Sequence, residues 1–217
     1  THDITAPDFH EHFHSARPED VLAHCWFRLE QAQTRPGDPM RTAVLGTVRA
    51  GATDTGVALR TVVVRAVDRN ARRVLCNTDR RTDKISQIGV SPGIGWLFYD
   101  PITRTQLRLT GSAEVLGEPA LDPHWSVLPT VSHRNFLTER APGTTHSQWT
   151  TDQSAYSEAT AGDLSANESE QARAHFAVIA TTVTTLDWVQ LDPNGNARAR
   201  FVWDPDRSCW DGSWVVP

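Results

Sequence analysis

Closely spaced strand patterns constrain the fold of this chain more than any other feature of its sequence. The stretch Thr105–Leu116 alternates apolar and polar side chains, which is typical of a strand with one buried face. Four further strands are predicted before it, over Thr42–Arg49, Leu59–Val67, Arg72–Asn77 and Gly95–Tyr99. Short antiparallel strands leave sheet edges exposed, and closure into a barrel removes those edges. We therefore expect a mainly β chain, built as an antiparallel barrel with a few short helices.

The other elements are predicted from periodicity and turn residues. A helix should begin near Pro18, because proline and acidic residues favour the first helical turn and apolar residues then recur at helical spacing. The run Val62–Val64 predicts a strand segment that is buried on both faces. Further helices are predicted over Thr82–Ile88, Pro123–Leu128, His133–Arg140 and Glu168–His175, and further strands over Phe176–Leu191, Ala197–Trp203 and Trp214–Pro217.

Apart from the short final segment Trp214–Pro217, these segments add up to about seven strands in a single domain over residues 1–217. Apolar density falls between residues 120 and 167, so that stretch is predicted as an irregular insertion within the domain. Residues 1–15 form a polar arm. Its histidines are candidates for adventitious metal binding, although an arm of modest order is the simpler interpretation; they are His2, His10, His12 and His14.

Composition narrows the classes of function. The net charge of -5 argues against a general nucleic-acid binder. No apolar run approaches the ~20 residues that span a bilayer, so no membrane partner is expected. The three cysteines, Cys25, Cys76 and Cys209, are widely spaced and predict neither a zinc site nor a disulfide framework. A reducing, cytoplasmic compartment fits this pattern best, and no metal site is predicted.

Basic residues are concentrated between Arg60 and Lys84, the only lysine of the chain. A hydroxyl and a cation beside a helix N-terminus form a natural anion site, which Thr82 and Lys84, with Arg60 and Arg81, could provide. A flavin nucleotide also needs an apolar platform and polar groups along its edges. The Val62–Val64 backbone could supply the platform, and Asn77, Thr78 and Gln106 the polar groups. The alternative is a solvated basic face whose arginines merely flank a strand.

Four motifs in order carry a family resemblance. They are Arg60–Arg65 (RTVVVR), Thr78–Lys84 (TDRRTDK), Phe98–Pro101 (FYDP) and Gln106–Gly111 (QLRLTG), and Leu186–Trp188 with Arg198–Phe201 add a closing hairpin. Together they resemble the pyridoxamine 5'-phosphate oxidase-like family of FMN-binding split β-barrels. The resemblance implies a homodimer with FMN at the subunit interface and a small-molecule substrate.

The resemblance also implies roles for individual residues. Arg60 and Lys84 would contact the FMN phosphate, with Thr82 adding a hydroxyl. Gln106 would reach FMN from the opposite subunit, and Arg200 from the C-terminal hairpin. The family's aromatic residue there aligns with either Trp188 or Val189. The remaining cofactor contacts would come from Thr61, Val62, Val63 and Arg65 along the ring, from Asn77 and Thr78 on the ribityl–phosphate side, and from Arg81.

Departures from the family pattern concern the substrate. The family's Arg-x-His on the last hairpin is replaced by Asn196-Ala-Arg198, and its second phosphate cation by Asp83. The stretch Trp125–Arg134 shows no match to the family's substrate-phosphate ligands. The sequence therefore resembles a divergent branch rather than a true pyridoxamine phosphate oxidase. We expect an FMN-dependent oxidoreductase with no identifiable catalytic side chain; a flavin-storage module and a haem-binding barrel are the alternatives.

Overall fold

The computed structural model describes residues 16–50, 55–146 and 164–217. The histidines of the N-terminal arm lie outside the described residues. Within them the chain forms one sheet of eight strands. The strands are β1 (Thr42–Ala50), β2 (Thr55–Asp68), β3 (Arg73–Asp79), β4 (Gly93–Asp100), β5 (Thr105–Val115), β6 (Phe176–Gln190), β7 (Ala197–Asp204) and β8 (Cys209–Trp214).

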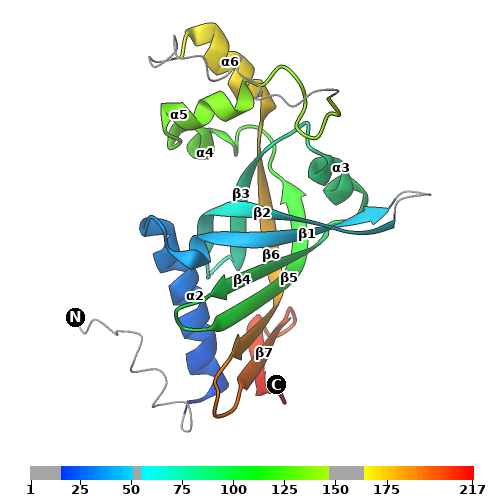
Figure 1. Ribbon diagram of the computed structural model, residues 1–217. Coiled ribbons are helices and arrows are strands. Elements are labelled where there is room, and N and C mark those ends of the chain that lie inside the picture. The colour runs from blue at the N-terminus through cyan, green and yellow to red at the C-terminus, as the bar shows by residue number, and fades with distance from the viewer. Residues whose placement is uncertain (1–15, 51–54, 147–163) are drawn as a thin grey trace.

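Six of the strands close into a barrel. The sheet order is β3-β2-β1-β4-β5-β6-β7-β8, and an additional β3–β6 pairing joins the first strand to the sixth. All pairings are antiparallel. The long strand β6 pairs with both β3 and β5 and continues into the β7–β8 extension below the barrel (Figure 1). The prediction of an antiparallel split barrel with short helices is confirmed.

Helices cover three sides of the barrel (Figure 1). Helix α2 (Pro18–Thr34) lies along one side and buries an apolar stripe that includes Val21, Cys25 and Leu29. Helix α3 (Asp83–Val90) follows β3 and packs near β1 and β5. The third group lies at one end of the molecule and consists of α4 (Asp122–Ser126), α5 (Thr130–His133), the 3-10 turn η2 (Arg134–Phe136) and α6 (Ala166–His175).

Two apolar clusters stabilise this arrangement. The larger fills the barrel and joins it to α2, with Trp96, Phe98, Leu107, Trp188 and Phe201 among its buried members. The smaller lies between the outer side of β3–β6 and the third helix group. There Leu75 and Val178 of the strands pack with Phe136 and Ala172 of the helices. Segment 116–137 and helix α6 therefore form one layer over the outer side of β3 and β6.

Three predictions about the elements were wrong. The run Val62–Val64 is not buried on both faces: Val64 is fully buried, but Val63 is 39% exposed because none of the segments that the structure describes packs over the outer face of β2. The last strand is β8, not Trp214–Pro217, because the chain reverses directly after β7, where the Asp204 carboxylate accepts hydrogen bonds from two backbone N–H groups. The predicted helix His133–Arg140 is instead the short pair α5 and η2.

Among the described residues, no helix is long and apolar enough to cross a membrane.

Candidate cofactor site

The turn between β3 and α3 gathers one cation and two hydroxyls. Lys84 Nζ donates to the hydroxyl oxygens of Thr78, at 2.8 Å, and Thr82, at 3.2 Å. The Thr82 hydroxyl in turn donates to the Asp79 carbonyl at 2.7 Å. Thr82 is the N-cap of α3, yet its side chain makes no capping bond. The first N–H groups of the helix are therefore left without a side-chain cap, and an uncapped helix N-terminus next to an ammonium group favours an anion.

Arg60 is held beside this turn by neutral groups. Its guanidinium donates to the Thr47 hydroxyl at 2.5 Å and to Gln87 Oε1 at 3.3 Å, and the Leu45 carbonyl lies at 3.5 Å. These partners come from β1 and α3, so Arg60 spans the gap between the barrel and the helix. Sequence reasoning missed Thr47 and Gln87, because no local pattern shows which side chains meet across the barrel.

Both cations are half-buried and lack a carboxylate partner within hydrogen-bonding distance in the described parts of the chain. Burial lowers the pKa of Lys84, and the charge of Arg60 lowers it further. Burial likewise lowers the pKa of Arg60, with Arg49 adding to the effect. An anion bound here would offset both penalties.

Cys76 does not supply that negative charge. The thiol is fully buried, and burial raises its pKa to about 12 even though Lys84, Arg60 and Arg65 lower it. It therefore stays protonated at neutral pH. The site keeps an excess of positive charge that fits a phosphate group.

Asn77 carries a second feature that favours a polar ligand. Its Oδ1 atom is buried, yet it has no hydrogen-bond partner among the described residues. A buried acceptor without a partner costs roughly 1–3 kcal/mol, so such atoms generally have one in the functional state. Asn77 was predicted to lie on the ribityl–phosphate side of the cofactor, and this unpaired atom fits a polar ligand there.

The predicted ring contacts divide between the two faces of β2. Thr61, Val63 and Arg65 lie on the exposed outer face, whereas Val62 is half-buried and faces the barrel. The outer face continues across β1 and β4, because directly paired residues share a face. It carries a group of exposed apolar side chains: Val48, Val57, Leu59, Val63, Leu97 and Tyr99.

A second group of predicted residues lies on the same outer face, but on β5, β6 and β7. Gln106 pairs with Val189, and Arg200 pairs with Asp187. Trp188 points the other way: it is 1% exposed and belongs to the core, and its ring contacts that of the partly exposed Trp214. The choice between Trp188 and Val189 stays untested, but Val189 is the one that shares the face of Gln106.

The altered hairpin residues have local roles. Arg198 forms two bonds with the Asp187 carboxylate, at 3.1 and 2.7 Å, and Arg108 shares that carboxylate at 2.9 Å. Although burial opposes it, hydrogen bonding from these two arginines lowers the pKa of Asp187. Asn196 accepts a hydrogen bond from the backbone of Asp192 within the turn.

The Arg81 side chain is directed away from Arg60 and Lys84. Its guanidinium donates hydrogen bonds to the Asp79 carboxylate and to the Thr138 hydroxyl. Its predicted contact with the phosphate stays a prediction. The structure thus brings together Arg60, Thr78, Thr82 and Lys84, with Asn77 on the opposite face of β3 from Thr78.

Comparison with known proteins agrees with this geometry. Residues 23–117 match the family model for the FMN-binding domain of pyridoxamine 5'-phosphate oxidase. The chain is similar to the crystal structure of a pyridoxamine 5'-phosphate oxidase-related, FMN-binding protein from Nostoc punctiforme, with 20% sequence identity and a TM-score of 0.69. The superposition covers 94% of this chain and 99% of the Nostoc chain. PhzG from Burkholderia lata is 17% identical, with coverages of 95% and 96% and a TM-score of 0.64. No curated protein matches the sequence.

At these identities the two structures establish a shared fold, and the family model adds the sequence likeness of the segment that carries Arg60 and Lys84. The chain has the split-barrel fold of these pyridoxamine 5'-phosphate oxidase-like structures, and its residues 23–117 are similar in sequence to the family's FMN-binding domain.

Proposed function

We propose that this protein binds FMN and uses it as an oxidoreductase acting on a small molecule. The observation that carries the proposal is the pair of half-buried cations, Arg60 and Lys84, which face hydroxyls instead of carboxylates. The match of residues 23–117 to an FMN-binding family supports the same ligand.

The residues present fit the phosphate end of FMN. Arg60 and Lys84 would bind the phosphate, with the hydroxyls of Thr78 and Thr82 beside them, and Asn77 would satisfy its unpaired oxygen on the ribityl side. The flavin ring would lie against the outer face of β2, along Thr61–Arg65. FMN supplies the redox chemistry when it is bound. The protein's part is to bind it, orient it and keep one face of the ring accessible.

Distance along β6 supports a two-subunit site. Asn77 pairs with Val178 and Gln106 pairs with Val189, eleven residues further along the same strand. At ~3.3 Å per residue this separation is at most roughly 36 Å along the strand. A separation of this order favours a site in which Gln106 contacts FMN from a second copy, and Arg200 would belong to the same contribution.

The exposed outer face offers a surface for that second copy. Its apolar side chains extend over β2, β1 and β4, between the two groups of predicted cofactor residues. Burying such a patch against its own copy is favourable at about 25 cal/mol per Å² of apolar surface. A symmetric dimer through this face would bring Gln106 and Arg200 of one protomer toward β2 of its partner.

Turnover of bound FMN tests the proposed activity. The protein loaded with FMN should be reduced by NADH or NADPH in a stopped-flow spectrometer, lose its absorbance near 450 nm, and recover it on exposure to air over repeated cycles. A non-catalytic flavin-storage module is the second candidate, favoured by the substitution of Asn196 and Arg198 for the family's Arg-x-His. Reduction no faster than that of free FMN with both reductants would favour storage over catalysis.

A further inference from the structure

All five N–H donors of Arg81 are engaged, and none is directed at the phosphate site. Nε lies 3.0 Å and Nη2 2.7 Å from the carboxylate oxygens of Asp79. Nη1 donates to the carbonyl of Thr138 at 2.9 Å and lies 3.4 Å from that of Glu139, while Nη2 also donates to the Thr138 hydroxyl at 2.9 Å. One side chain thus joins the β3–α3 turn to a segment 57 residues away in the sequence.

Asp79 connects this arginine to the predicted phosphate ligands. Its carboxylate is 6% exposed and forms an ion pair with the Arg81 guanidinium. It also accepts a hydrogen bond from the backbone N–H of Arg81, at 2.8 Å. Its carbonyl accepts the hydroxyl of Thr82, which in turn accepts from Lys84. A continuous series of hydrogen bonds therefore runs from Lys84 through Thr82 and Asp79 to Arg81 and Thr138.

The preceding residue fastens the same turn to a second element. The Arg80 backbone N–H donates to the His175 carbonyl at 2.8 Å, and its guanidinium donates to the Phe176 carbonyl at 3.1 and 3.3 Å. His175 Nδ1 lies 2.8 Å from the Phe136 carbonyl. The turn is thus attached both to the segment after η2 and to the junction of α6 with β6.

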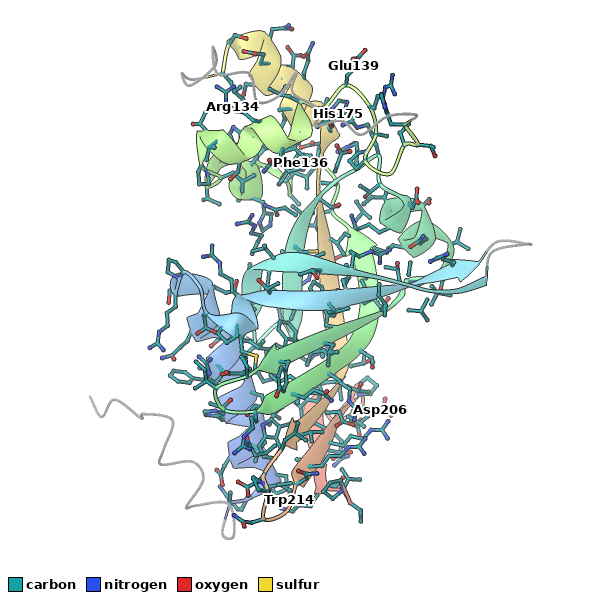
Figure 2. The ribbon with its side chains drawn as sticks, in the orientation of Figure 1. Arg134, Phe136, Glu139, His175, Asp206 and Trp214 are labelled. Carbon is teal, nitrogen blue, oxygen red and sulfur yellow. The ribbon has the colours of Figure 1, made fainter. Side chains whose placement is uncertain are left out.

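The attached segment forms one wall of a cavity. The cavity measures about 580 Å³ and is lined by Leu137, Thr138 and Glu139 together with residues of α6, including His175. Figure 2 shows Glu139, His175, Arg134 and Phe136 gathered at this end of the molecule, opposite Asp206 and Trp214. Arg81 therefore positions this wall relative to the cofactor's phosphate turn.

We propose that Arg81 is a positioning residue that couples the segment Leu137–Glu139 to occupancy of the FMN phosphate site. This coupling rests on the proposed function, whereas the anchoring of the segment by Arg81 does not. A phosphate bound by Lys84 and Thr82 fixes the Asp79–Thr82 turn, and the guanidinium fork transmits that restraint to Thr138. Coupling of two sites is reciprocal, so loosening the segment should also weaken FMN binding.

Lysine at position 81 separates charge from geometry. Its ammonium group can still neutralise Asp79, but as a point charge it lacks the planar fork that reaches Asp79 and Thr138 together. Arg35→Lys is the matched control, because Arg35 is exposed at the end of α2. Thr138→Val provides a milder variant, which removes only the hydroxyl that Nη2 contacts.

Limited trypsin digestion of the full chain reports the state of the segment. Arg140 is exposed and follows Glu139, so cleavage after it can be identified by the masses of the fragments 1–140 and 141–217. Saturating FMN should slow this cleavage severalfold in the wild type and in Arg35→Lys. In Arg81→Lys the cut should be severalfold faster without FMN, and FMN should no longer slow it. Thr138→Val should lie between the two.

The outcomes separate the two proposals, because FMN binding is measured in parallel by flavin fluorescence. If Arg81→Lys is cut faster but keeps the same ratio of rates with and without FMN, the residue is only structural and the coupling is refuted. Binding of FMN to the wild type without protection also refutes it, while the proposed function stands. If the wild type does not bind FMN, the proposed function fails and the coupling with it; equal cleavage of Arg81→Lys and Arg35→Lys without FMN would then refute the anchoring role as well.

Discussion

Replacing Lys84 with methionine should weaken FMN binding by roughly 10- to 150-fold. A hydrogen bond between a charged group and its partner is worth about 1.5–3 kcal/mol, and each 1.4 kcal/mol is a factor of ten in affinity. Methionine keeps an unbranched apolar stem and has nearly the helix propensity of lysine, so α3 should form as before. The dissociation constant can be measured by quenching of FMN fluorescence.

The matched control for this variant is Arg35→Met, which makes the same change in net charge at an exposed position distant in sequence from the turn. It should bind FMN within about twofold of the wild type, as surface changes away from a site usually do. If Lys84→Met binds FMN as tightly as Arg35→Met, the ammonium group does not contact the phosphate, and the β3–α3 turn is not the cofactor site.

Alanine at position 111 should lower the free energy of unfolding by about 3 kcal/mol, the upper part of the range for an overpacked interior. A Cβ atom on Gly111 would lie 2.1 Å from the Thr182 carbonyl oxygen and 3.0 Å from Val183 Cα. These are backbone atoms of β6, so they cannot move without disturbing the β5–β6 pairing, whose register shifts at this residue. Urea denaturation at a fixed protein concentration measures the change.

Gly95→Ala provides the comparison, because its added Cβ would meet only the Leu109 carbonyl, at 4.0 Å, which is ordinary contact. Alanine is also less costly than glycine inside a strand, so stability should stay the same or rise slightly. Equal losses in both variants would show that the close approach of β5 and β6 at Gly111 does not determine stability.

The barrel could be predicted because its strands are marked by alternating apolar and polar residues, a pattern that can be read within each strand. Thr105–Leu116 alternates, and β5 follows it almost residue for residue. The predictions failed where burial depends on distant segments. The apolar run of β2 has the composition of a fully buried strand, yet none of the described segments covers its outer face. β8 was placed too late because its Gly212 and Ser213 obscure the strand pattern.

The candidate site shows the same difference between residues that local motifs predict and residues whose contacts depend on distant segments. Arg60, Thr82 and Lys84 are near one another in sequence motifs, and the structure brings them together around Thr78 and Thr47. Arg81 shares the motif, and sequence proximity alone predicted that it would join them. Its direction is set instead by Thr138 and Glu139, in a segment whose position no sequence pattern near Arg81 could reveal.

The most direct test of the account compares FMN with riboflavin, which has the same ring and ribityl chain but no phosphate. The apoprotein is titrated with each flavin, and binding is followed by the quenching of flavin fluorescence. FMN should bind at micromolar concentration or tighter, and riboflavin at least about tenfold more weakly, because Arg60 and Lys84 act on the phosphate. Equal affinity for the two flavins, or no binding of FMN at micromolar concentration, would contradict the assignment of this cationic turn as an FMN site.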